Sequence, residues 1–105
     1  MTTVPPKIKA LLGFAQNSRN LLSGETAVES AVTRNKARLV ILSYDLPGKR
    51  KFHWENRCQN CGISYVTLGT KEEFGQLLGT SERSVLAVTD DKMAAAIRKE
   101  LGHKI

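Results

Sequence analysis

Two short apolar runs constrain the fold of this chain more than any other feature of its sequence. The first occupies residues 37–43 (Ala-Arg-Leu-Val-Ile-Leu-Ser) and the second residues 84–89 (Ser-Val-Leu-Ala-Val-Thr). Apolar runs of this length are typical of strands that are covered on both faces. Such strands need helices on both sides of one sheet, so the two runs predict a layered α/β domain.

The remaining segments alternate between helical and strand patterns. Apolar residues at helical spacing predict helices over residues 6–18, 26–34 and 51–60, a fourth between the capping residues Thr70 and Gly79, and a last one from Asp90 or Asp91 to residue 101. Further strands are expected at residues 21–23 and 63–68. This order predicts a three-layer α-β-α sandwich with a four-stranded mixed sheet. At 105 residues the chain fits one domain, over residues 5–105, after a flexible N-terminus of residues 1–4.

The charge balance favours a polyanionic partner. Sixteen Lys and Arg residues against ten Asp and Glu residues give a net charge of +6. Binding of nucleic acid by such a domain is driven by the release of condensed counterions. Aromatic residues make up only 6% of the chain, which argues against a stacking platform for single strands and favours recognition of RNA shape. We therefore expect structured RNA as the partner and no DNA.

Other sequence signals concern the compartment. No segment is long and apolar enough to span a membrane, and the first residues lack the pattern of a signal peptide. Two cysteines in a chain with ample core residues fit a reducing compartment. We expect a cytoplasmic protein without a membrane partner.

The pair Cys58 and Cys61 is the one motif that could indicate metal or redox chemistry. A structural zinc site needs four ligands, and only His53 and His103 could complete it. The motif closes the predicted helix over 51–60, where the helix dipole does not lower a thiol pKa. We interpret one of the two cysteines as a core residue and the other as incidental.

Catalytic signatures are absent from the sequence. It contains no nucleophile elbow and no P-loop, because Gly48-Lys49 lacks the upstream glycine. Asp90 and Asp91 are better explained as a helix cap than as a metal pair. The sequence therefore predicts no catalytic residue, no metal and no cofactor, and a protein that is not an enzyme.

Several groups of residues together suggest a family. They are Ser23-Gly24-Glu25, residues 37–45, Cys58 with Gly62-Ile63, residues 71–75 with Gly79, and residues 85–90. In this order and spacing, over residues 6–101, they resemble the ribosomal protein L7Ae superfamily, whose members bind kink-turn RNA. The resemblance is closest to the bacterial YlxQ-type branch, which has a similar length, Leu-Gly-Phe-Ala start and Ser-Gly-Glu loop.

The resemblance implies an α-β-α sandwich with an RNA-binding edge. In the family this edge comprises the loop before the second helix, the start of that helix, the loop after the second strand and the loop before the last strand. At these positions the chain has Ser23, Gly24, Glu25, Thr26, Ala27 and Ser30, then residues 45–50, then residues 80–83.

The chain departs from the family at the residues that read bases. Kink-turn binders carry Gly-x-Asn-Glu-x-x-Lys, and here Thr26, Ala27 and Ser30 replace the Asn, Glu and Lys. Each lost polar contact removes roughly 1–3 kcal/mol of binding. The apolar residues that flank the bulged nucleotide are replaced by Ser81-Glu82-Arg83. We therefore expect contacts to phosphates rather than to base edges.

Basic residues near this edge could supply those contacts. A mobile Lys-Arg-Lys loop beside Gly48 can adapt to a phosphate backbone, and the exposed amides of Ser23-Gly24-Glu25 at the start of the second helix can hold one phosphate. Trp54, behind that loop, is interpreted as a packing residue, with stacking on a base as the alternative. The candidate RNA-binding residues are Ser23, Gly24, Glu25, Thr26, Ser30, Arg34, Lys36, Lys49, Arg50, Lys51, Ser81 and Arg83.

Two functions follow from the sequence. The first is a non-enzymatic, ribosomal-protein-like RNA-binding protein that associates with the ribosome and binds structured RNA, ribosomal RNA being one candidate, mainly through phosphate contacts. The alternative is a protein-interaction module of the transcription or translation machinery, in which the degenerate kink-turn site faces a protein partner.

Overall fold

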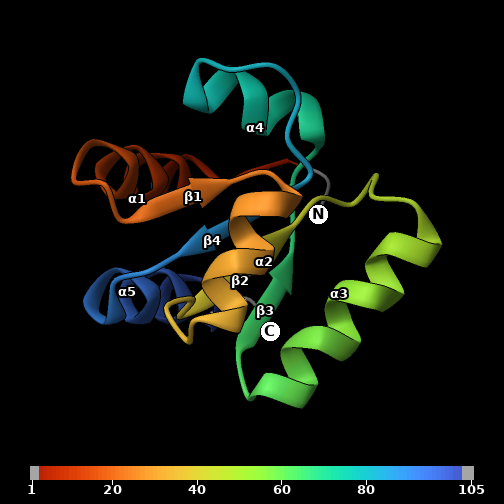
Figure 1. Cartoon of the computed structure of the whole chain (residues 1–105). Helices are drawn as coiled ribbons and strands as arrows, with labels where there is room; N and C mark the ends of the chain where they lie inside the picture. Colours follow the sequence, from red (N-terminus) through yellow and green to blue (C-terminus); the bar gives the residue numbers. More distant parts are fainter. Residues whose placement is uncertain (1–2, 103–105) are drawn as a thin grey trace.

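A computed structural model describes residues 3–102 of the chain. Figure 1 shows a central sheet with helices on both of its sides. In chain order the elements are α1 (Pro6–Asn17), β1 (Leu21–Ser23), α2 (Glu25–Thr33), β2 (Leu39–Leu42), α3 (Gly48–Cys61), β3 (Ser64–Thr67), α4 (Lys71–Leu78), β4 (Val85–Val88) and α5 (Asp91–Gly102).

The four strands lie in the order β1-β4-β2-β3. Strand β4 runs antiparallel to both β1 and β2, whereas β2 and β3 are parallel, so the sheet is mixed. The two central strands are the two apolar runs of the sequence, since a central strand is covered on both faces and flanked on both edges. The predicted three-layer sandwich with a four-stranded mixed sheet is confirmed.

Successive residues of a strand point to opposite faces, and β2 shows how this divides the core. Leu39 and Ile41 belong to an apolar cluster with α1, α4 and α5, while Val40 and Leu42 belong to a second cluster with α2 and α3. All four residues are buried. Each helical layer thus has a core of its own, and the sheet separates the two.

The N-terminal boundary of the packed domain differs from the expected one. Val4 is only 1% exposed and packs in the cluster around Ile8, and its amide donates to Oε2 of Glu73 at 3.1 Å. Residue 4 is therefore part of the core and not of a flexible end. Local sequence could not show this, because the apolar cover for Val4 comes from elements far along the chain. Residues 1 and 2, and 103–105 with His103, lie outside the described residues.

Helix α3 begins three residues earlier than expected. Its N-cap is Pro47, with an extended backbone (φ −55°, ψ 146°), and Gly48 is its first residue. The basic residues Lys49, Arg50 and Lys51 are therefore held in the first turn of a helix, and the prediction of a mobile loop is wrong. Burial of Trp54 inside the second core holds this turn in place.

Other local signals were correct. Thr70 and Glu73 form a capping box at the start of α4, and Gly79 ends that helix with a left-handed backbone (φ 70°). Asp90 accepts a hydrogen bond from the amide of Met93 at 2.9 Å, as a residue at a helix start does. Among the described helices, none combines the length and apolarity needed to cross a membrane.

Candidate nucleic-acid interface

A groove lies where the turn from β1 into α2 meets the loop that precedes β4. Its volume is about 590 Å³, and it is lined by Ser23, Gly24, Glu25, Thr26, Ala27, Glu82, Arg83 and Ser84. The turn depends on Gly24, whose φ of +92° is one that other residues rarely adopt. The amide of Gly24 donates to the carbonyl of Val85 at 2.9 Å, which fixes the start of α2 beside β4.

Arg83 lies across this turn. A Cβ atom on Gly24 would be 3.9 Å from both Cδ and Nε of Arg83, so the side chain packs directly over the glycine. Nη1 of Arg83 donates to Oγ of Ser81 at 2.6 Å and to the carbonyl of Glu82 at 3.1 Å. These bonds orient the guanidinium over the groove, and its Nε and Nη2 groups bond to no residue within positions 3–102. The guanidinium of Arg83 is therefore oriented over the groove, with Nε and Nη2 available to donate hydrogen bonds to a ligand.

The amides at this turn are not all available. The amide of Gly24 was expected to be able to hold a phosphate, but it is bound to Val85. The sheet imposes this bond, which a local pattern could not reveal. The amides of Glu25, Thr26 and Ala27 open α2 and lack intrahelical acceptors, so an anion would find its donors in this first turn.

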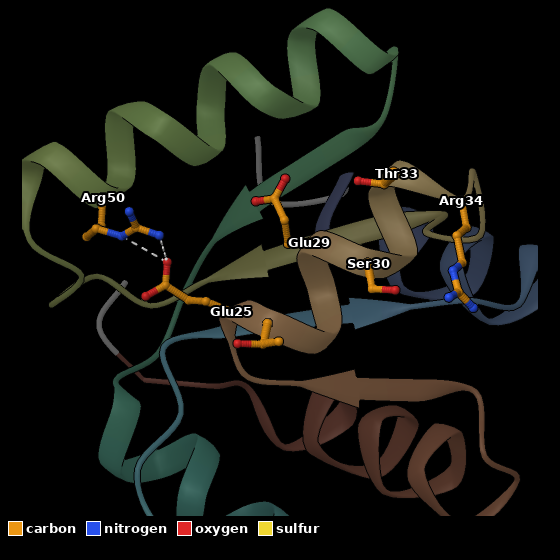
Figure 2. A pocket seen from close by; sticks show the side chains of 7 residues that line it. Glu25, Glu29, Ser30, Thr33, Arg34 and Arg50 are labelled. Atoms are coloured by element: carbon orange, nitrogen blue, oxygen red, sulfur yellow. Dashed lines mark hydrogen bonds and ion pairs between the residues drawn. The ribbon is translucent and has the colours of Figure 1, made fainter.

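A second hollow, of about 560 Å³, continues from the groove along the outer side of α2. Its lining residues are Glu25, Thr26, Glu29, Ser30, Thr33, Arg34 and Arg50 (Figure 2). Because Glu25 and Thr26 line both hollows, the two meet at the first turn of α2. Together they form one surface that reaches from Arg83 to the end of α2.

Charged side chains and two neutral hydrogen-bonding ones join α2 to α3 along this surface. We call them the ionic seam: Glu25, Glu29 and Thr33 of α2 with Arg50, His53, Trp54 and Arg57 of α3. Glu25 accepts from Nε of Arg50 at 2.9 Å and from Nε1 of Trp54 at 2.8 Å. Figure 2 shows the bond between Arg50 and Glu25 at the start of both helices.

The seam continues one turn further along both helices. Glu29 accepts from Nε of Arg57 at 2.5 Å, and Nε2 of His53 lies 3.3 Å from its other oxygen. Nη2 of Arg57 also donates to Oγ1 of Thr33 at 2.8 Å. Early residues of α2 contact early residues of α3, and later residues contact later ones. The two helices therefore run side by side in the same direction.

These contacts keep both carboxylates ionised at neutral pH. Burial raises the pKa of Glu25, but hydrogen bonds from Arg50 and Trp54 and the charge of Arg50 outweigh it, so the pKa lies below its ordinary value. The hydrogen bond from Arg57 is the largest influence on Glu29 and brings its pKa below the ordinary value despite burial. Arg50 therefore faces a carboxylate of its own chain and is not a spare cation for a phosphate.

The structure brings most of the predicted RNA-binding residues together. Ser23, Gly24, Glu25, Thr26 and Arg83 line the groove, Ser81 touches Arg83, and Ser30, Arg34 and Arg50 line the second hollow. Lys49 and Lys51 lie in the first turn of α3, next to Arg50.

Lys36 follows the C-terminal end of α2, which is roughly 13 Å from the first turn of that helix at 1.5 Å per residue. Lys36 is therefore not part of the groove.

The cysteines lie as expected at the end of α3. Cys58 is buried and Cys61 exposed. Burial raises the pKa of Cys58 to about 11, so its thiol stays protonated. In the part of the chain that the structure describes, no three His, Cys, Asp or Glu side chains are arranged to hold a metal ion.

Phe52 is a surface residue that the sequence interpretation overlooked. Its side chain is 67% exposed beside Lys51, whereas Trp54, the aromatic weighed as a stacking residue, is fully buried as its packing interpretation predicted. Residues two apart on a helix lie about 200° apart around its axis. Both residues fall within the helix predicted over 51–60, so the inward Trp54 already implied that Phe52 lies on the outer face.

Known proteins share this fold and part of this sequence. Residues 6–98 match the sequence model of the ribosomal protein L7Ae/L30e/S12e/Gadd45 family. The RNA-binding protein YlxQ of Bacillus subtilis (strain 168) is 30% identical over 84 residues, which cover 80% of this chain and 84% of that protein.

Two solved structures have a similar fold. A protein of unknown function from Bacillus halodurans superimposes with a TM-score of 0.87 at 31% identity, over 93% of this chain and 99% of that one. The Giardia lamblia 15.5kD RNA binding protein superimposes with a TM-score of 0.79 at 20% identity, over 98% of this chain and 94% of that one. At 20% identity, the similarity to the Giardia protein is evidence for the fold alone.

Proposed function

Because the chain belongs to the ribosomal protein L7Ae/L30e/S12e/Gadd45 family, we propose that it is a non-enzymatic protein that binds structured RNA. The observation that carries this proposal is the groove between α2 and the loop before β4, with the guanidinium of Arg83 oriented over Gly24. The net charge of +6 supports it, and so does the likeness to an RNA-binding protein of Bacillus subtilis.

The groove favours phosphates over base edges. Thr26 presents a short hydroxyl and Ala27 a methyl group in the groove, and Ser30 presents a hydroxyl in the adjoining second hollow, where kink-turn binders carry an amide, a carboxylate and an amine. Hydroxyls, helix-start amides and a guanidinium can all bind phosphate oxygens, and such contacts fix register without reading sequence. We therefore propose that RNA shape, rather than base identity, selects the ligand.

An RNA ligand recognised by shape suggests which RNA the protein binds and in which compartment. A small basic protein of this family that binds RNA by shape would act on ribosomal RNA or on a ribosome-associated RNA, in the cytoplasm. Neither DNA nor a membrane is expected as a partner. We also propose that Lys49 and Lys51 at the start of α3, and Arg34 at the far end of the second hollow, strengthen binding as further phosphate contacts.

The test is a binding titration by fluorescence anisotropy with two labelled RNAs, a kink-turn RNA and a hairpin of matched length without the kink. We expect both to bind, with an affinity that falls at least about tenfold between roughly 50 and 200 mM salt for a few phosphate contacts.

Arg83→Ala should weaken binding to both RNAs. Arg98→Ala is the matched control, because it removes the same charge from a hollow beside β3. Binding that is undetectable, or insensitive to salt, would show that the proposal is wrong.

A protein-binding role is the second candidate, and the replaced kink-turn residues Thr26, Ala27 and Ser30 favour it. In the seam beside them, Arg50 and Arg57 neutralise Glu25 and Glu29, so this part of the second hollow offers balanced charge rather than free cations. A protein surface of the transcription or translation machinery would fit such a hollow. Association with ribosomes that survives RNase treatment would favour this role over RNA binding.

A further inference from the structure

Two phenylalanines are exposed to a similar extent but have different surroundings. Phe14 on α1 is 70% exposed and Phe52 on α3 is 67% exposed. No charged residue lies within four positions of Phe14 in the sequence, so its surroundings on α1 are neutral. Phe52 follows the lysines at positions 49 and 51 at the start of α3, and Glu55 is the one acidic residue within four positions of it. Single exposed apolar residues are common on protein surfaces, so the neighbouring charge distinguishes Phe52.

The two lysines retain their positive charge for a partner. Neither Lys49 nor Lys51 forms an ion pair with any residue between positions 3 and 102, whereas Arg50 between them is bound to Glu25. Lys49 is exposed, and Lys51 is partly exposed. We call Lys49, Lys51 and Phe52 the Phe52 patch. It combines an aromatic ring with two unneutralised cations.

The patch lies on the far side of α3 from the groove. The bonds from Arg50 and Trp54 to Glu25 tie the start of α3 to the first turn of α2, and Glu25 lines the groove. Phe52 is two positions from both Arg50 and Trp54, which places it about 200° from each around the helix axis. Duplex RNA seated in the groove therefore does not meet Phe52, and only an unpaired strand that passes over the first turn of α3 can reach it.

We propose that the Phe52 patch binds an unpaired nucleotide of the RNA held in the groove. The inference rests on the proposed function and adds a class of ligand, structured RNA with a single-stranded flank. The base stacks on the ring of Phe52, and Lys49 and Lys51 contact the flanking phosphates. Stacking tolerates any base, which agrees with a groove that does not read sequence. The low aromatic content excluded a platform of several rings, but one ring suffices for one nucleotide.

The test compares two RNA hairpins that differ only in a short unpaired uridine extension. Wild-type protein should bind the extended hairpin more tightly than the blunt one. Phe52→Ala should weaken binding of the extended hairpin by about 5- to 150-fold, the range for loss of one stacked base, and leave the blunt hairpin unaffected. Phe52→Trp should retain the preference. Phe14→Ala, with matched exposure on α1, should change neither affinity.

Each other outcome has a defined meaning. If wild-type protein binds neither hairpin, the proposed function itself fails. If it binds both equally and Phe52→Ala changes nothing, this inference is overturned while RNA binding stands. An equal loss for both hairpins would also overturn it, because the ring would then serve the duplex. Photocrosslinking of the uridine extension gives an independent readout: we expect peptides containing Phe52, and crosslinks confined to other segments would count against the patch.

Discussion

The two helical layers are held to the sheet in different ways. On one side, α1, α4 and α5 pack through a cluster of apolar side chains that includes Val4, Ile8 and Phe74. On the other side, α2 and α3 share the apolar contacts of Trp54 and Cys58 with the sheet, but are joined to each other by the ionic seam. The first layer therefore depends on burial, and the second depends on both burial and charge.

The features proposed to meet a ligand lie on one side of the protein. The seam, the second hollow and the Phe52 patch all lie on the α2 and α3 side, and the groove adjoins the seam and the second hollow at Glu25. Burial is insensitive to salt and pH, whereas exposed ion pairs are screened by salt and lost on protonation. The apolar side can thus serve as the rigid support for a side whose charges meet a ligand.

Phe74→Ala tests the apolar side and should have the largest effect. Phe74 is fully buried on α4, and removal of its ring should lower the free energy of unfolding by about 3–5 kcal/mol. The loss, measured by chemical denaturation, should be equal at low and high salt. A loss that depends strongly on salt would contradict the distinction between the layers.

Gly75→Ala tests how the apolar side supports the groove. A Cβ atom at Gly75 would lie 2.7 Å from the carbonyl oxygen of Ser81, so either the loop or α4 must shift. We expect a cost of about 1–3 kcal/mol, as for other overpacked sites. Because Ser81 orients Arg83, RNA affinity should also fall. Gly13→Ala is the control, since a Cβ there meets nothing within 4 Å. Unchanged stability would show that the loop moves freely.

A double-mutant cycle of Glu29→Gln and Arg57→Met tests the seam. Both side chains are about a third exposed, so solvent screening reduces the coupling to about 0.2–1 kcal/mol. The coupling should shrink as salt is raised. Arg98→Met, at an exposed arginine without an ion pair within residues 3–102, should leave stability nearly unchanged. A coupling that persists at high salt would mean that the pair acts through packing.

The same pair predicts a pH dependence. The pKa of Glu29 lies below its ordinary value of 4.5 in the folded protein, so its stabilising contribution is complete above pH 4.5 and is lost as pH falls through the lowered pKa. The loss of stability between pH 7 and acid pH should therefore be smaller in Glu29→Gln than in the wild type, by denaturation at each pH. Equal losses would show that other carboxylates carry the acid sensitivity.

The smallest expected effect is that of Glu25→Gln on RNA binding. This change removes a carboxylate from the groove and releases Arg50 from its ion pair, while the amide can still bond to Trp54. We expect RNA affinity to rise by roughly two- to fivefold at low salt, the effect of about one recovered charge contact. Arg50→Gln should lower it only slightly. A fall in affinity for Glu25→Gln would mean that the seam positions the groove for RNA.

The sequence by itself determined the elements and the class of fold. The apolar runs predicted β2 and β4 as strands covered on both faces, and the capping signals predicted both ends of α4, because these patterns record burial and backbone geometry along the chain. The turn at Gly24 was also identified from the chain alone, through the family resemblance carried by Ser23-Gly24-Glu25.

The tertiary structure alone decided which side chains meet. Arg50 pairs with Glu25 and Arg57 with Glu29, over 25 and 28 positions of sequence, and no local pattern encodes such partners. It also placed Lys49 and Arg50 in the first turn of α3, where the sequence predicted a loop, because Trp54 anchors this turn by burial in the second core. Periodicity reports that a residue is buried or exposed, but the charge it faces depends on elements brought beside it by the fold.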